Sequence, residues 1–205
     1  MRAGSILVVA LALLLGGCAA ALVASTSDPW QKLNDAVVLF EQRGRPLPAE
    51  KLVRESIEIF ETQKDPHGLA NSYVTYGELL SSRVVASREK VYRRDGFYDR
   101  SLTFDARLAK AEEYFRRALP LFDEAEKRYL KSGTYDRLSN AYFREANALL
   151  YLKQKPAACD SLVKAKEAAR TNIARNPDAR QNLPSETKRS FAEFIDRYRN
   201  SVGCG

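Results

Sequence analysis

The side chains that could do chemistry in this chain are few, and they are led by three cysteine thiols. The first of them, Cys18, follows Gly16 and Gly17 at the end of an uncharged apolar stretch, residues 6–15. Because a thiol is a strong nucleophile, Cys18 is a candidate acceptor for a covalent lipid. The same stretch could instead be a secretory signal or a membrane span. The choice decides the compartment in which the rest of the chain folds.

The residues around Cys18 resemble a known processing signal. Arg2 supplies the positive charge expected before the apolar part of a signal peptide, and Leu15-Gly16-Gly17-Cys18 resembles the lipobox of bacterial lipoproteins. This resemblance implies removal of the signal peptide, residues 1–17, diacylglycerol on the Cys18 sulfur and an acyl chain such as palmitate on its new amino group. Ala19 implies passage to the outer membrane of a Gram-negative cell envelope, facing the periplasm. An uncleaved anchor over residues 6–24 is the alternative, since that uncharged stretch is nearly long enough to span a bilayer.

The other two cysteines, Cys159 and Cys204, form an even pair once Cys18 is lipidated. In an oxidising envelope such a pair is plausible as a disulfide. The bond would tie the end of the chain to an internal helix and close a loop of about 45 residues, which the chain-entropy model values at about 4 kcal/mol. In a reducing host the two residues would be free thiols.

Patterns for catalysis and metal binding are missing from the sequence. The one histidine, His67, follows Pro66 in an expected turn, where we expect it to be exposed to solvent rather than catalytic. The spacing of His, Cys, Asp and Glu fits no metal site, and no phosphate-binding glycine loop occurs. Carboxylate pairs such as Glu112-Glu113 fit the solvated face of a helix. We therefore expect no enzymatic activity, no catalytic residue, no metal and no cofactor.

The charge is modestly basic, with 33 Lys and Arg against 26 Asp and Glu and a formal net charge of +7. The basic residues are interspersed with acidic ones, so nucleic acid is not an expected partner. A positive charge on an exported protein indicates anionic surfaces or acidic partners instead.

Helical patterns begin at Asp28-Pro29, where Asp28 is the expected N-cap, and continue along the chain without a convincing strand. Segments 69–80 (LANSYVTYGELL) and 138–151 (LSNAYFREANALLY) match each other. After each segment comes a second helix with a small, a large and a small residue at equivalent positions. These residues are Ala111, Phe115 and Ala118 in the first case, and Ala158, Leu162 and Ala165 in the second.

This repeated pattern resembles the tetratricopeptide repeat (TPR), in which small residues such as Gly77 and Ala146 let two helices approach closely. A weaker copy runs from Leu33 to Ser56. The resemblance implies an all-α fold: a short TPR-like solenoid of about three helix pairs over residues 29–182. The lipidated Cys18 and its linker would occupy residues 18–28. A generic helical bundle, in which the same residues merely pack, is the alternative.

A capping helix and tail are expected in residues 183–205, with Ser185 as the N-cap. A solenoid needs such a helix to close its exposed end. Its apolar face is predicted from the helical spacing of four residues. They are Phe191, Phe194, Ile195 and Tyr198.

The second repeat contains an insert at about 84–105, in which basic and aromatic residues alternate. Such composition is typical of binding loops. Alternatively, both helices of the pair lengthen, the aromatic rings pack together and the arginines are solvated. The insert surface is predicted to present Arg88, Tyr92, Arg93, Arg94, Phe97 and Tyr98.

The TPR resemblance also implies a concave groove lined by the first helix of each pair, where asparagines could bind the backbone of a peptide and aromatic residues could anchor it. The predicted groove residues are Asn71, Glu78, Asn140, Phe143, Asn147 and Tyr151, with Gln31, Asn34 and Val74 at related positions.

Two functions follow as expectations. The first is a membrane-anchored adaptor or scaffold that binds another cell-envelope protein or peptide, in secretion, pilus or outer-membrane assembly. The second is an inhibitory or immunity-type lipoprotein that blocks an enzyme or toxin in the periplasm. Fold alone does not identify the partner.

Overall fold

The computed structural model describes residues 26–177 and 190–204, and every regular element in these ranges is a helix. This confirms the predicted all-α fold class. Cys18, the signal region and Ser185 lie outside the described residues. The elements are α1 (Pro29–Val37), the π-helix η1 (Val38–Gln42), α2 (Pro46–Gln63), α3 (Pro66–Ser81), α4 (Arg83–Ala86), α5 (Glu89–Asp95), α6 (Arg107–Ser132), α7 (Tyr135–Tyr151), α8 (Lys155–Arg175) and α9 (Phe191–Ser201).

Short polar side chains cap the start of several helices. Asp28 accepts a hydrogen bond of 2.9 Å from the backbone N–H of Trp30, and a proline follows it at the first position of α1. Asp65 caps α3 in the same way. These caps satisfy backbone N–H groups that have no partner inside the helix. The predicted start at Asp28 is thus confirmed. In α9 the N-cap is Ser190, which forms a capping box with Glu193.

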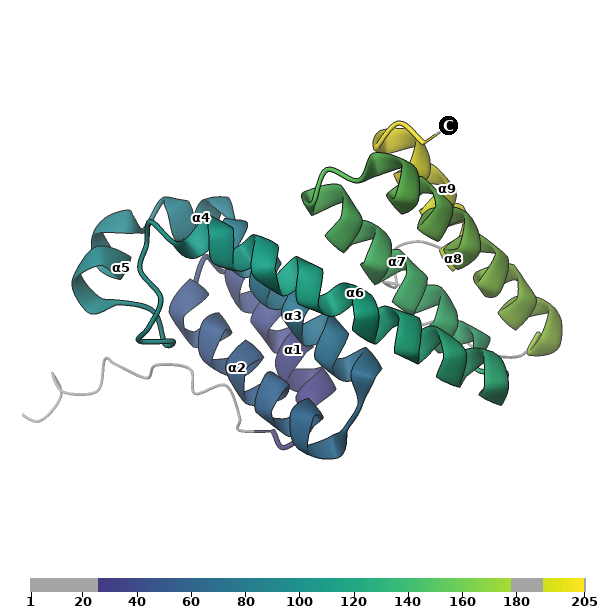
Figure 1. Ribbon diagram of the computed structural model, residues 1–205, viewed down its shortest axis with the longest axis horizontal. Helices are drawn as coiled ribbons and strands as arrows, with labels where there is room; N and C mark the ends of the chain where they lie inside the picture. The colour runs from purple at the N-terminus through teal and green to yellow at the C-terminus, as the bar shows by residue number, and fades with distance from the viewer. Residues whose placement is uncertain (1–25, 178–189, 205) are drawn as a thin grey trace, which may run out of the picture.

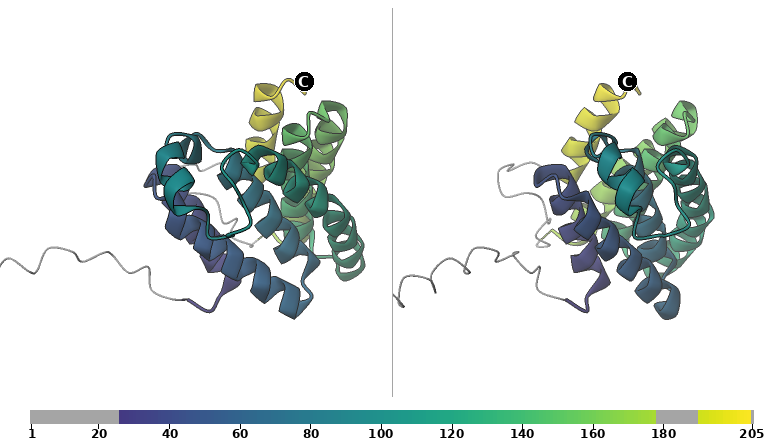
Figure 2. Two further views of the ribbon diagram at one scale, coloured as in Figure 1. Left: turned by 60° about the vertical axis from the view of Figure 1, so that its left-hand side comes forward. Right: turned by 90° about the vertical axis from the view of Figure 1, so that its left-hand side faces the viewer.

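The helices pack in successive pairs, which Figure 1 shows along the longest axis of the molecule. α1 packs against α2, α3 against α6, and α7 against α8, while α9 packs against α8. α3 also contacts α1 and α7, so the first helices of the three pairs are neighbours. This arrangement is compatible with a helical repeat. α4 and α5 lie at one end of the molecule and α9 at the other (Figures 1 and 2).

Small residues stand where the paired helices come closest. A Cβ atom added to Gly77 of α3 would lie 2.7 Å from the ring of Phe115 in α6, closer than carbon atoms can approach. In the next pair, Ala146 and Ala158 are fully buried between α7 and α8. The close approach predicted at these positions is therefore present.

The predicted insert forms α4, α5 and the loop that leads to α6. α3 ends at Ser81 and α6 begins at Arg107, so the pair does not simply lengthen through this segment. The rings of Tyr92 and Phe97 are nonetheless buried, and they stack with centroids 4.3 Å apart. The insert is therefore a separate segment, as expected for a binding loop. Its aromatic rings nevertheless pack inward, as expected for the alternative of two lengthened helices.

A buried carboxylate holds the insert against α2. The Oε1 atom of Glu50, which is 0 % exposed, accepts hydrogen bonds from the Tyr76 hydroxyl at 2.8 Å and from the backbone N–H of Asp99 at 3.2 Å. Burial raises the pKa of Glu50 above its ordinary value, and these hydrogen bonds oppose that rise. The loop after α5 therefore lies beside the first turns of α2.

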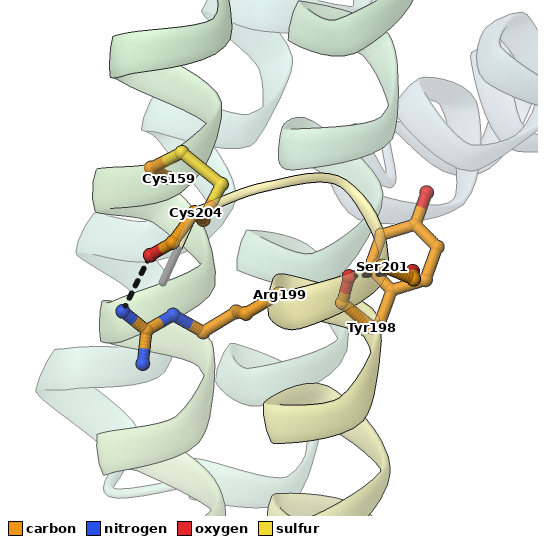
Figure 3. Close-up of a disulfide and its surroundings, with 5 residues drawn as sticks. All are labelled: Cys159, Tyr198, Arg199, Ser201 and Cys204. Atoms are coloured by element: carbon orange, nitrogen blue, oxygen red, sulfur yellow. Dashed lines mark hydrogen bonds between the residues drawn. A yellow bond between two sulfur atoms is a disulfide. The ribbon is translucent and has the colours of Figure 1, made fainter.

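A disulfide joins Cys159 in α8 to Cys204 just after α9, across 45 positions of sequence. This is the pairing considered from the sequence. Figure 3 shows that Arg199 reaches the same corner, where its Nη2 atom donates a hydrogen bond of 3.2 Å to the Cys204 carbonyl. The end of α9 is therefore fixed to the beginning of α8.

Candidate functional site

The candidate site is an aromatic cluster shared by α7 and α9, defined by Phe143, Phe191, Phe194 and Tyr198. The Phe143 ring lies 5.8, 5.5 and 5.2 Å from the rings of Phe191, Phe194 and Tyr198. The three α9 rings share one side of the helix because they recur at helical spacing. Phe143 comes from α7 and fills the space between them, so the two helices build one aromatic surface.

Part of this cluster remains open to solvent. The Phe194 side chain is 39 % exposed, whereas Ala192 and Ile195 of the same helix are buried. The Tyr198 hydroxyl donates a hydrogen bond of 3.0 Å to the Asn147 Oδ1 atom on α7. The inner side of α9 thus secures the helix, and Phe194 leaves an aromatic ring available to a partner.

An ion pair between α3 and α7 forms a second part of this region. Arg144 lies 3.2 Å from Glu78, with 18 % and 14 % of the two side chains exposed, and Arg144 also donates a hydrogen bond to Thr75. Burial raises the pKa of Glu78, and the positive charge of Arg144 opposes that rise. The Glu78 carboxylate and the Arg144 guanidinium bind each other within the protein, so Glu78 is not a free carboxylate for a ligand.

The remaining predicted groove residues occupy different environments. Asn71 is buried, and its amide donates to the backbone carbonyl of His67, so it does not line an accessible groove. Asn140 is exposed. Phe143 and Asn147 meet α9. Tyr151 is half exposed and stacks on Phe115 at 4.5 Å.

The related positions on α1 and α3 differ in the same way. The Gln31 amide donates to Asp35 on its own helix, and Asn34 is exposed. Val74 is fully buried. The structure therefore gathers Asn147 and Phe143 into one surface with α9, and it leaves α1 with polar side chains in solvent.

His67 differs from its expected exposure to solvent. It is 3 % exposed, because the first turn of α3 carries its ring against Trp30 of α1 and Tyr129 of α6. Its Nδ1 atom is 2.8 Å from the Tyr129 hydroxyl. Burial lowers the pKa of His67 to about 4, with Asp65 acting in the opposite direction. The histidine is therefore a neutral part of the core.

The insert divides its predicted surface residues into buried and exposed sets. Tyr92 and Phe97 belong to the core and Tyr98 is half exposed. Arg93 pairs with Glu89 and Asp105, Arg94 pairs with Asp95, and Arg88 donates to the Gly44 carbonyl at 2.9 Å. The insert therefore presents Tyr98 and its arginines to solvent, while Tyr92 and Phe97 pack inward.

Sequence reasoning missed the partnership of α9 with α7. The helical spacing of Phe191, Phe194, Ile195 and Tyr198 indicated one apolar face, and of these four Ile195 is fully buried as expected. Ala192 is buried beside it, whereas Phe194 remains 39 % exposed. The spacing within one helix does not say which helix it meets.

The arrangement is suited to binding. Aromatic rings beside amide groups can take up an apolar side chain and hydrogen-bond the backbone next to it. Among residues 26–177 and 190–204, no three His, Cys, Asp or Glu side chains are grouped to hold a metal ion. No helix in these same ranges combines the length and the apolar character needed to cross a membrane. Comparison with protein-family models, curated proteins and solved structures yields no match.

Proposed function

We propose that this protein is an interaction module of the tetratricopeptide-repeat type. Segments 69–80 and 138–151, which match in sequence, lie within α3 and α7, the first helices of two successive pairs. Gly77 and Ala146 stand at equivalent positions and allow the same close helix contact. Shared sequence at equivalent places in neighbouring pairs is what an internal repeat produces.

The binding surface of this proposal is the aromatic cluster, and the observation that carries it is the exposure of Phe194 beside Phe143 and Tyr198. An aromatic ring costs little conformational entropy when it binds, and it buries a large apolar area. Asn140, on the same helix as Phe143, is exposed, and its side chain also lies beside the His67 ring. A partner segment with an apolar side chain fits this surface.

The proposed place of action is the bacterial cell envelope, with acylated Cys18 as the membrane anchor. The support is the Leu15-Gly16-Gly17-Cys18 motif together with the Cys159–Cys204 disulfide, which suits an oxidising compartment. Two or more acyl chains give a stable anchor, whereas one gives only marginal binding. The protein would act there as an adaptor for another envelope protein or peptide.

Affinity capture from detergent extracts tests the binding surface. The wild type should capture a stoichiometric envelope partner, and the variant Phe194→Ala should capture at least about tenfold less of it. Truncating a central aromatic residue removes a large share of the binding energy. The matched control is Leu130→Ala on α6, whose side chain is 50 % exposed and lies outside the cluster. Equal thermal stability of both variants would show that folding is not the cause.

The result that contradicts this proposal is equally specific. If Phe194→Ala retains its partner while Tyr98→Ala loses it, the binding surface lies on the insert. If no stoichiometric partner is captured by the wild type, the adaptor role itself is wrong.

A further inference from the structure

A group of cations lies at the end of the molecule opposite α9. It belongs to the loop between η1 and α2 and to the insert, and we call it the cationic end. Residues 43–47 and 83–100 contain eight Lys and Arg against three Asp and Glu, so this end carries much of the positive charge of the protein. Its members are Arg43, Arg45, Arg83, Arg88, Lys90, Arg93, Arg94 and Arg100.

Two contacts hold these segments together. The Arg88 Nη2 atom donates a hydrogen bond of 2.9 Å to the carbonyl of Gly44, which joins the insert to the loop before α2. The backbone N–H of Asp99 donates to buried Glu50 of α2. The cations of the two segments therefore belong to one end of the fold, where Figures 1 and 2 show α4 and α5.

The acidic residues nearby offset only part of this charge. Glu89 pairs with Arg93, and Asp95 pairs with Arg94. Among the described residues, four cations of the cationic end form no side-chain hydrogen bond and no ion pair. These are Arg43, Arg45, Arg83 and Lys90.

A hollow next to these cations is large enough for a phosphate group. Residues 86–91 line an open space of about 550 Å³ at the turn between α4 and α5. Arg88 and Lys90 supply positive charge there, and Glu89 is engaged by Arg93, while the Ser87 hydroxyl donates to the Val84 carbonyl. Guanidinium and ammonium groups are the usual protein partners of phosphate.

Two apolar side chains are exposed at the same end. Leu47, in the first turn of α2, is 39 % exposed, and Tyr98, beside Glu50, is 50 % exposed. Tyrosine is enriched where protein meets the headgroup region of a membrane, and an aliphatic side chain gains by entering the acyl boundary. Cations combined with exposed apolar side chains favour a lipid surface over a purely polar anionic partner.

We propose that the cationic end binds anionic phospholipid headgroups, with a lipid phosphate in the hollow at residues 86–91. The inference rests on the proposed membrane attachment, which brings the folded body within about 30 Å of the bilayer through residues 18–25. The cationic end would then orient the body on the membrane and leave the aromatic cluster, at the other end, pointing away from the attached side.

Hydrogen exchange of the full chain in lipid vesicles tests this orientation. The protein is reconstituted in phosphatidylcholine vesicles and in vesicles that also contain phosphatidylglycerol, at about 50 mM salt. Exchange in residues 43–47 and 83–100 should slow at least about tenfold in the anionic vesicles, since each cation near the surface contributes about fivefold. The difference should disappear at about 0.5 M salt, where charges are screened.

Matched charge variants supply the control. The triple variant Arg43→Gln, Arg45→Gln and Lys90→Gln should abolish the difference between the two vesicle types, and none of these side chains holds the fold. A second triple variant removes the same charge far from this end and should keep the difference. It carries Lys127→Gln, Lys131→Gln and Arg170→Gln, all at exposed positions of α6 and α8.

The possible results separate this inference from the membrane attachment. If the protein floats with both kinds of vesicle but hydrogen exchange at the cationic end is equal in the two, lipid binding by the cationic end is wrong and the anchor remains supported. Flotation with anionic vesicles alone, lost in the first triple variant, supports the cationic end and contradicts the anchor. Displacement by about 10 mM inorganic phosphate at constant ionic strength would show a site for free anions, and would overturn the lipid proposal.

Discussion

His67 is a residue whose charge is set by its place in the fold. Its ring is enclosed by Trp30 and Tyr129, and burial lowers its pKa from 6.5 to about 4. The folded protein thus binds a proton at this site less readily than the unfolded chain does. Stability from this group is fully present above pH 6.5 and is lost as the pH falls towards 4.

We therefore predict that the free energy of unfolding falls by about 3 kcal/mol from this site between pH 7 and pH 4. The variant His67→Gln should lack this component, and the chain contains no second histidine to replace it. Urea denaturation of both proteins across this range measures the effect. Glu50, Glu78 and Glu145, whose raised pKa values act in the opposite direction, are present in both proteins and cancel in the comparison. Parallel pH profiles would show that His67 is accessible to protons when folded.

The Glu78–Arg144 pair gives a second prediction at this scale. Replacement by Arg144→Met should lower the free energy of unfolding by about 3 kcal/mol at pH 7, because it leaves a buried carboxylate without its cation. The loss should be smaller at pH 5, where Glu78 can take up a proton. The control Arg116→Met removes an exposed pair with Glu112 and should cost less than about 1 kcal/mol. Equal losses in urea denaturation would mean that the pair between α3 and α7 is solvated.

At the scale of elements, the start of α1 was the most predictable feature, whereas the last helix begins after Ser190 rather than after Ser185. Asp28 and Pro29 interact with their own helix, so the local sequence was sufficient to place the start of α1. Gly77 and Ala146 were predictable because only small residues allow helices so close together. By contrast, the burial of His67 depends on Tyr129, which is distant in sequence and belongs to another pair.

The residues of the aromatic cluster could be predicted from the sequence, but their meeting could not, because it depends on contacts between distant parts of the chain. Phe143 was expected in a groove, and the spacing of Phe194 and Tyr198 indicated one face of a helix. Their meeting depends on the packing of α9 against α8 and on the disulfide, which are long-range features. Similarly, the sequence of the insert showed basic and aromatic residues but not that Tyr92 and Phe97 turn inward.

The disulfide supports a prediction about α9. An isolated helix of this length is marginal in water, and α9 buries only Ala192 and Ile195 deeply. Replacing Cys159 and Cys204 by serine should lower the free energy of unfolding by about 4 kcal/mol in the chain-entropy model. It should also speed hydrogen exchange more in α9 than in α3 and α6. Unchanged exchange in α9 would show that its contacts with α7 and α8 suffice.

At the scale of the whole molecule, the two ends differ in chemistry. The aromatic cluster lies on α7 and α9, and the cations of the insert lie at the other end (Figure 1). The long helix α6 runs between the regions and belongs to both parts of the core. A rigid connection of this kind would keep a partner bound at one end at a fixed distance from a membrane bound at the other.

The most direct test of the central claim is photo-crosslinking from the aromatic cluster in living cells. A photoreactive phenylalanine analogue is placed at Phe194 and, as a control, at Leu130, which is also exposed but lies outside the cluster. The account predicts one covalent adduct of defined mass from position 194 and none from position 130. No adduct from position 194, or an equal adduct from position 130, would contradict it.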